Sequence, residues 1–188
     1  MLLAHADGMR MHDAAALIRP AVTDRGGRWA DLGAGTGTFS RALAILLGPA
    51  GTVYAVDRDR RTLATLGRPG DVPAGAATVV PVVADFTTPL ALPALDGALL
   101  ANALHFVSDG DQATVLGQVA ALLRPGGALV LVEYERRAAS RWVPYPISRA
   151  RFAALAATAG LTAPAPLGER PSAYGGVLYA AVAHRPGV

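Results

Sequence analysis

Short apolar segments alternate with segments of helical periodicity along the chain, and this alternation constrains the fold more than any other feature of the sequence. Strand-like length and composition occur at residues 28–32, 52–56, 78–83, 95–101, 128–132 and 177–183. Helices are expected at residues 11–18, 38–47, 59–66, 109–123 and 148–160. The alternation predicts an α/β fold with a doubly wound, mostly parallel sheet. Pro81 further predicts that residues 78–83 form an edge strand, because proline lacks the N–H that a second neighbouring strand would need.

The composition favours one compact domain. The chain has 188 residues, of which 52% are hydrophobic and 16% charged, and no repeat or long linker divides it. These values argue against a disordered chain, which needs high charge and few apolar residues. No apolar run reaches the roughly 18 residues of a membrane-spanning helix, and the first residues lack the basic start and apolar stretch of a signal peptide. We therefore expect a cytoplasmic protein without membrane insertion.

The distribution of charge argues against a nucleic-acid partner. The formal net charge of +3 comes from arginine, because the chain has no lysine, and the arginines form small clusters at 58–61 and 136–141. Acidic residues flank both clusters. Nucleic-acid binding needs a sustained basic surface, which this pattern does not supply.

A glycine-rich turn lies between the first predicted strand and the helix that follows it. Gly33, Gly35 and Gly37 allow the backbone to turn tightly and to approach a ligand closely. Asp57 ends the next strand 20 residues after Gly37, a spacing at which a carboxylate binds both hydroxyls of an adenosine ribose. The alternative is that Asp57 caps the following helix. A nicotinamide-dependent oxidoreductase would place its third glycine where this chain has Thr38, so the spacing argues against a dinucleotide site.

At these residues the chain resembles the class I S-adenosylmethionine (SAM)-dependent methyltransferases, whose first motif is an acid followed by x-Gly-x-Gly-x-Gly. The resemblance extends over about residues 29–134. It implies a Rossmann-like, seven-stranded sheet with an antiparallel last strand, SAM as cofactor and S-adenosylhomocysteine as product. It also implies that the glycine loop contacts the amino acid end of SAM and that Asp57 binds the ribose. The set of cofactor-binding residues that we expect is Asp31, Gly33, Ala34, Gly35, Gly37, Asp57, Arg58, Asp85, Phe86 and Asn102.

Two of these residues belong to a later motif. Val83-Ala84-Asp85-Phe86 resembles the segment in which an aspartate accepts a hydrogen bond from the adenine amino group and the next side chain lies against the ring. The alternative is that Asp85 caps a turn and Phe86 belongs to the core. Residues 95–105 and 122–132 resemble the family's fourth strand and the helix, turn and fifth strand that come after it.

The groups nearest to the transferred methyl should follow the fourth and fifth strands, because sites in doubly wound sheets lie at the carboxyl ends of the central strands. His105 is the first candidate for a general base, since imidazole is neutral over much of the physiological pH range. The alternative is that His105 only packs or bonds to backbone. Glu133 and Tyr134 are the further catalytic candidates, for which a structural role is the alternative.

The acceptor is expected to be a small, apolar or aromatic molecule methylated at oxygen, carbon or nitrogen. Residues 102–105 lack the prolines and the aromatic of nucleobase amine methyltransferases, and they resemble the Asn-x-Leu-His segment of quinone-biosynthetic methyltransferases. The chain has only three glutamates, which argues against the paired glutamates of arginine methyltransferases. The absence of cysteine excludes thiolate-dependent arsenic methylation, and we expect no metal.

The parts outside the cofactor motifs should recognise the acceptor. We expect a single methyltransferase domain over 1–188, with an N-terminal helical lid (1–27), a cofactor-binding core (28–134) and an acceptor-side region (135–188). Trp142 and Tyr145, in a loop stiffened by prolines, could wall the acceptor, and His12 could enter from the lid. Such short flanks limit the size of the acceptor, or require a partner chain such as the second copy of a homodimer. The rival reading is a non-catalytic SAM sensor or structural subunit.

Overall fold

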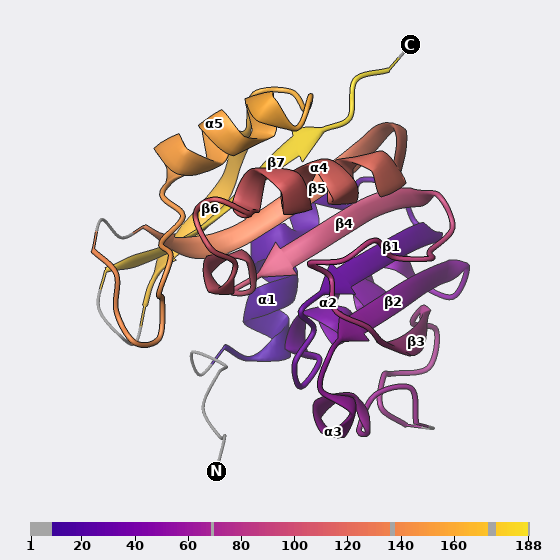
Figure 1. The fold of residues 1–188 in the computed structure, drawn as a ribbon. Helices are drawn as coiled ribbons and strands as arrows, with labels where there is room; N and C mark the ends of the chain where they lie inside the picture. Colours follow the sequence, from indigo (N-terminus) through magenta and orange to yellow (C-terminus); the bar gives the residue numbers. More distant parts are fainter. Residues whose placement is uncertain (1–8, 69, 136–137, 173–175, 188) are drawn as a thin grey trace.

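The computed structural model describes residues 9–68, 70–135, 138–172 and 176–187. It contains a seven-stranded sheet with the strand order β3-β2-β1-β4-β5-β7-β6 (Figure 1). The elements are α1 (Met11–Ile18), β1 (Gly27–Leu32), α2 (Thr38–Leu47), β2 (Gly51–Asp57), α3 (Arg60–Leu63), β3 (Thr78–Val83), β4 (Leu95–Ala101), α4 (Gln112–Leu122), β5 (Leu123–Glu135), α5 (Arg149–Thr158), β6 (Ala165–Pro171) and β7 (Val177–His184), with 3-10 turns at Arg19–Ala21 and Leu104–Phe106.

The pairing of the strands confirms the expected fold class. The first five strands are parallel to one another, and β7 runs antiparallel to both β5 and β6. Pro81 lies in β3, which pairs only with β2 and forms one edge of the sheet, as predicted. Within the described ranges, no helix is long and apolar enough to span a membrane.

Two apolar clusters, one on each face of the sheet, form the core. Helices α1 and α2 pack on one face, and α4 and α5 cover the other (Figure 1). Successive residues of the central strands alternate between the clusters: Leu99 belongs to the first and Leu100 to the second. Because both faces are covered, the middle parts of these strands, residues 97–101 and 128–132, are apolar on both sides and show no alternation with polar residues.

The helix boundaries follow local signals. Helices α1 and α2 have the predicted bounds, and the hydroxyl of Ser148 accepts a hydrogen bond from the N–H of Arg151 at the start of α5, as expected of an N-cap. The helix predicted at 59–66 is wrong in length, since α3 ends at Leu63. This segment buries only Leu63 and Leu66, and so little apolar surface cannot stabilise a longer helix.

The strand predictions fail in two places. β5 begins at Leu123, whereas the strand was predicted to begin after a turn at 125–127. In the structure, Gly126 and Gly127 exchange hydrogen bonds with Arg185, so these residues extend the sheet through an irregular register and do not end it. β6 was not predicted, because its prolines, its glycine and its mostly exposed residues do not resemble a strand.

Candidate functional site

Loops that leave the carboxyl ends of the central strands lie together on the side of the sheet where these strands end (Figure 1). The connection after β1 returns through α2 on one face, and the connection after β4 returns through α4 on the other. The winding of the chain therefore reverses between β1 and β4. In doubly wound sheets this switch point opens the crevice that binds ligands.

The three glycines after β1 have positive φ angles of 79° at Gly33, 53° at Gly35 and 84° at Gly37, a backbone conformation that residues other than glycine rarely adopt. Their surroundings differ. A Cβ atom at Gly33 would lie 2.6 Å from the Cβ of Ala103, and one at Gly37 would overlap the side chain of Leu66. A Cβ at Gly35 would meet nothing within 4 Å. Gly33 and Gly37 are therefore required by protein packing, whereas Gly35 borders open space into which a ligand can fit.

Asp57, at the end of β2, fixes the glycine loop. Its Oδ2 accepts a hydrogen bond of 2.8 Å from the N–H of Gly35, and its Oδ1 accepts one of 2.8 Å from the N–H of Asp59. Asp59, and not Asp57, is the N-cap of α3, since its side chain accepts from the N–H of Arg61. Each carboxylate oxygen of Asp57 has a second lone pair, so the group can still accept hydroxyl donors.

Asp31 is buried at the end of β1, with 1% of its surface exposed. The hydroxyl of Ser40, in the first turn of α2, donates a hydrogen bond of 2.6 Å to its Oδ2. Burial raises the pKa of Asp31 to about 6; the charge of Asp57 adds to this effect and the hydrogen bond from Ser40 opposes it. A carboxylate that is this costly to bury indicates a role other than stability.

Asn102, the first residue after β4, is strained and has an unpaired polar atom. Its φ angle is 52°, while its N–H donates to the carbonyl of Val132 in the neighbouring strand. Its side-chain oxygen is buried and has no hydrogen-bond partner among the described residues. Since an unsatisfied buried acceptor costs free energy, it fits a site that receives a donor from a ligand.

Asp85 and Phe86 follow β3, next to the same loop. The Oδ1 of Asp85 accepts hydrogen bonds from the N–H and the hydroxyl of Thr87, which lower its pKa. Asp85 therefore does cap a turn, and its other oxygen is the one that could serve a ligand. The ring of Phe86 would lie 3.4 Å from a Cβ at Gly33, so it borders the glycine loop.

His105 and Glu133 form a buried pair between the segment after β4 and the end of β5. The His105 Nδ1 lies 2.7 Å from Oε2 of Glu133, and the backbone N–H of His105 donates to Oε1 at 3.2 Å. Only 2% of His105 and none of Glu133 is exposed. A neutral imidazole that donates its Nδ1 proton to this carboxylate has the lone pair on Nε2, which can accept a proton. The structure thus brings together two of the three predicted catalytic residues.

The remaining predicted residues differ in their distance from this pair. The ring of Tyr134 is 6.1 Å from that of His105, and Tyr145 donates its N–H to the carbonyl of His105 at 3.1 Å. Trp142 is 56% exposed and stacks with Arg141. His12 is exposed on α1, and no contact described for it reaches the site. Arg58 is exposed beside Asp57, and its positive charge contributes to the lowered pKa of Asp85.

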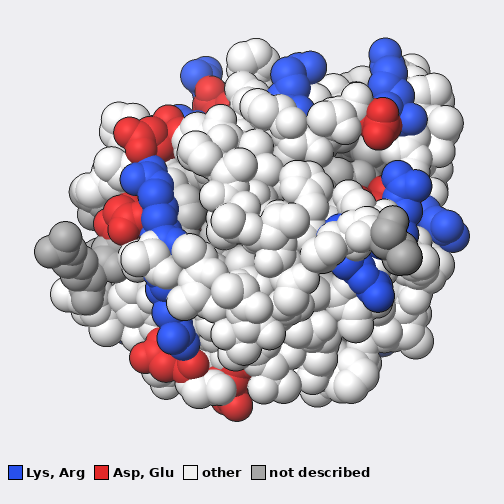
Figure 2. Space-filling model, turned by 90° about the horizontal axis from the view of Figure 1, so that it is seen from above, with Lys and Arg blue, Asp and Glu red and all other residues white. Residues whose placement is uncertain are grey.

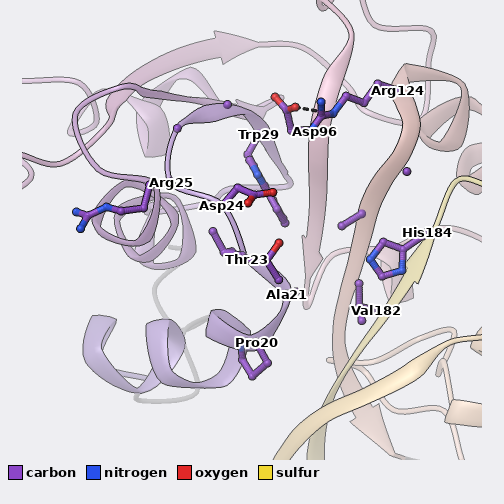
Figure 3. A pocket seen from close by; sticks show the side chains of 15 residues that line it. Pro20, Ala21, Thr23, Asp24, Arg25, Trp29, Asp96, Arg124, Val182 and His184 are labelled. Atoms are coloured by element: carbon purple, nitrogen blue, oxygen red, sulfur yellow. Dashed lines mark ion pairs between the residues drawn. The ribbon is translucent and has the colours of Figure 1, made fainter. Parts of the chain in front are cut away.

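The structure has two cavities of note. One, of about 310 Å³, is lined by Thr87, by the segment 106–108 that follows His105, and by residues at the start of α4. A second, of about 380 Å³, lies at the opposite, amino end of the strands, where Asp96 and Arg124 form an ion pair of 2.6 Å (Figure 3). No residue predicted for the cofactor or the acceptor lines this second cavity. No group of three or more His, Cys, Asp or Glu residues in the described ranges could hold a metal ion.

Some contributors to the site were not predicted. Ser40 and Ala103 carry no recognisable chemistry in the sequence, and their roles come from contacts with Asp31 and the glycine loop. The pairing of His105 with Glu133 joins positions 28 apart and was not predicted, although both residues were singled out.

Comparisons with known proteins agree with this geometry. A family model described as a methyltransferase domain matches residues 30–127. A Burkholderia thailandensis 1,6-didemethyltoxoflavin-N1-methyltransferase, solved with 1,6-didemethyltoxoflavin and S-adenosylhomocysteine, is 25% identical with a TM-score of 0.70, over 94% of this chain and 78% of that one. A SAM-dependent methyltransferase from Methanosarcina mazei is 15% identical with a TM-score of 0.69, over 91% and 98%. The magnesium protoporphyrin IX methyltransferase of Synechocystis, solved with SAM, is 15% identical with a TM-score of 0.66, over 93% and 77%. A search of curated proteins found no match.

Proposed function

Since this chain belongs to the class I SAM-dependent methyltransferases, we propose that it methylates a small, apolar or aromatic acceptor with His105 as the general base. The observation that carries the proposal is the buried pair of His105 and Glu133, with 2.7 Å between Nδ1 and Oε2, at the carboxyl ends of two central strands. The acceptor atom is an oxygen, carbon or nitrogen that loses a proton as it is methylated.

The residues at the switch point fit SAM. Gly35 leaves open space beside the backbone, Asp57 offers free lone pairs at the position of a ribose-binding acid, and Asn102 has a buried oxygen that needs a donor. We assign the ribose to Asp57 and the amino acid end of SAM to the glycine loop and Asn102. Asp85 and Phe86 are assigned to the adenine.

The chemistry divides between cofactor and protein. SAM supplies a methyl group that is already activated by the positive charge of its sulfonium. The Nε2 of His105 takes the proton from the acceptor atom. Glu133 holds the imidazole through Nδ1 and the backbone N–H, and its charge stabilises the imidazolium that forms. Because both side chains are buried, water competes little with this hydrogen bond.

Exposed apolar side chains support an apolar acceptor. Phe106 is 52% exposed next to His105, and Trp142 and Tyr145 are exposed in the loop after β5. Phe106 also lines the cavity of about 310 Å³. The neighbour from B. thailandensis binds 1,6-didemethyltoxoflavin, which supports a small-molecule acceptor here. On the face seen in Figure 2, the described arginines are interspersed with acidic residues around an uncharged centre, so this face offers no continuous basic track for a nucleic acid.

The three expected regions of the chain, 1–27, 28–134 and 135–188, differ in the groups that they contribute to the proposed site. Residues 28–134 contain all the groups assigned to SAM and all those assigned to catalysis, whereas 135–188 adds Trp142 and Tyr145 on the acceptor side. The proposed lid, 1–27, includes residues 1–8, which lie outside the described residues. Its described part, α1, packs against α2 and β6.

Two measurements on the purified chain test the proposal. Isothermal titration should show one SAM bound per chain, and a panel of phenols and hydroxyquinones incubated with SAM should include compounds that produce S-adenosylhomocysteine. The absence of both heat and thermal stabilisation at millimolar SAM would refute the cofactor site. SAM binding without turnover on any acceptor of the panel would favour the sensor reading instead.

A further inference from the structure

Gln112 is a buried polar residue that the proposed chemistry does not use. Five polar or charged side chains are buried in the described part of the chain. Four of them form the pairs Asp31 with Ser40 and His105 with Glu133. The fifth is Gln112, the first residue of α4, and no part of it is exposed. An amide is costly to bury unless its hydrogen bonds are made.

The amide of Gln112 makes three hydrogen bonds. Its Nε2 donates to the carbonyl of Val107 at 3.2 Å and to that of Tyr145 at 3.4 Å, and its Oε1 accepts from Nε of Arg151 at 3.1 Å. The partners fix the orientation of the amide, since carbonyls only accept and a guanidinium only donates. Arg151 also donates to the carbonyl of Asp109 at 2.7 Å.

These bonds join three segments that lie far apart in the sequence. Val107 and Asp109 follow β4, Tyr145 lies in the loop at 138–147 after β5, and Arg151 is in α5. The same loop reaches the candidate base directly, because the N–H of Tyr145 donates to the carbonyl of His105. Val107, two residues after His105, lines the cavity of about 310 Å³. Gln112 therefore links the loop at 138–147 to the segment after β4 that carries His105.

A separate hydrogen bond holds the end of the loop that leads into α5. The buried hydroxyl of Tyr179 donates to the carbonyl of Ile147 at 2.9 Å. Burial raises the pKa of Tyr179, so the hydroxyl stays protonated and can donate. Loss of the hydrogen bond from Gln112 to Tyr145 would thus loosen the part of the loop around Trp142 and Tyr145 and leave α5 in place. A hydrophobic residue could fill the same space, but it would lack the directional hydrogen bonds by which the satisfied amide holds the loop in one arrangement.

We propose that Gln112 and Arg151 are positioning residues that hold the loop at 138–147 against His105 and so define the acceptor side of the site. This inference rests on the proposed function, because the loop recognises an acceptor only if methyl transfer occurs beside it. The side-chain hydrogen bonds described for these two residues go neither to the residues assigned to SAM nor to the side chain of His105.

The first test is Gln112→Met, which keeps the volume and removes both donors. Hydrogen–deuterium exchange should quicken about tenfold at the amides of Val143 and Tyr145, the factor that corresponds to one lost hydrogen bond. The KM of the acceptor found in the panel should rise by a similar factor, whereas the Kd of SAM and the kcat should change less than about twofold. A change of SAM affinity in step with KM would overturn the inference, because it would indicate general disruption.

The second test is Arg151→Met, which leaves Gln112 in place and removes the group that orients its amide. Arg185→Met is the matched control, since the guanidinium of Arg185 likewise donates two hydrogen bonds, in its case to the backbone carbonyls of Ala121 and Leu123, at the amino end of the sheet. If Gln112→Met does not fold, Arg151→Met alone decides. Loop exchange equal to that of the control, or faster exchange with an unchanged KM, would refute the positioning role. A wild-type chain that binds no SAM would refute the proposed function instead, and the exchange data would still decide whether Gln112 fastens the loop.

Discussion

Asp31→Asn should make the protein more stable at neutral pH and weaken its binding of SAM. The carboxyl of Asp31 has a pKa of about 6 in the folded protein, against 3.8 for an ordinary aspartate, chiefly because it is buried. A raised pKa means that the folded state binds the proton more tightly than the unfolded state does. The stability that this proton contributes is complete below about pH 4 and is lost as the pH rises through about 6.

The size of the effect follows from the shift. About two pKa units correspond to about 3 kcal/mol between the protonation states, so the ionised Asp31 costs up to about 3 kcal/mol above pH 7. Asparagine has no charge, and its oxygen can still accept the hydroxyl of Ser40. The free energy of unfolding of Asp31→Asn should exceed that of the wild type by up to about 3 kcal/mol at pH 8, equivalent to roughly 6–12 °C in Tm for a chain of this size. The difference should vanish near pH 4.

Urea unfolding of both proteins at pH 4, 6 and 8 measures this difference, and calorimetric titration at pH 8 measures SAM affinity. Ser40→Ala is the control: it removes a hydrogen bond to the ionised form, so it should destabilise the protein at pH 8 by about 2 kcal/mol and much less at pH 4. A stability difference between Asp31→Asn and wild type that is the same at all three pH values would refute the reasoning. A gain in stability with unchanged SAM affinity would show that Asp31 is not kept for the cofactor.

Three further outcomes are expected. Gly35→Ala should fold with a free energy of unfolding about 1 kcal/mol lower, because of its φ of 53°, and should bind SAM at least tenfold more weakly in calorimetry. Gly33→Ala, whose new methyl group would meet Ala103, should lose about 3 kcal/mol of stability in urea unfolding. Equal SAM affinities in Gly35→Ala and wild type would contradict the open space assigned to the cofactor. Glu133→Gln should keep the hydrogen bond to His105 and lower kcat about 100-fold with SAM affinity unchanged. His105→Ala keeps the backbone N–H that donates to Glu133 but removes the imidazole from the buried carboxylate, and it should cost about 3–5 kcal/mol of stability. A fall in SAM affinity that matches the fall in kcat would argue against a base. Asn102→Gly should raise the free energy of unfolding by about 1 kcal/mol, because glycine adopts this φ without strain and lacks the unpaired oxygen. The same substitution should weaken SAM binding. A stable variant with wild-type SAM affinity would rule out a role of Asn102 in binding.

The sequence predicts those parts of the fold and site that depend on neighbours along the chain. The glycine turn, Asp57 and the helix at 38–47 are marked by local signals, so their positions could be predicted directly. β6 was missed because an edge strand with one neighbour tolerates proline and glycine, and residues 125–127 were misplaced because Arg185, far along the chain, bonds to them. Gln112 carries no local signal at all. Its role depends on how β4 and β5 are placed side by side, which only the tertiary structure shows.

The position of β7 has a consequence for the order in which the chain is built on the ribosome. β6 is synthesised before β7 but pairs only with it, so β6 cannot join the sheet until the later strand has emerged. The edge of β5 is unpaired until the same moment, and Glu133 lies on that strand opposite Tyr179 of β7. A nascent chain that already contains all the residues assigned to SAM therefore still lacks the strand that lies opposite Glu133 of its proposed catalytic pair. The insertion of β7 would complete both the sheet and the environment that the chemistry needs.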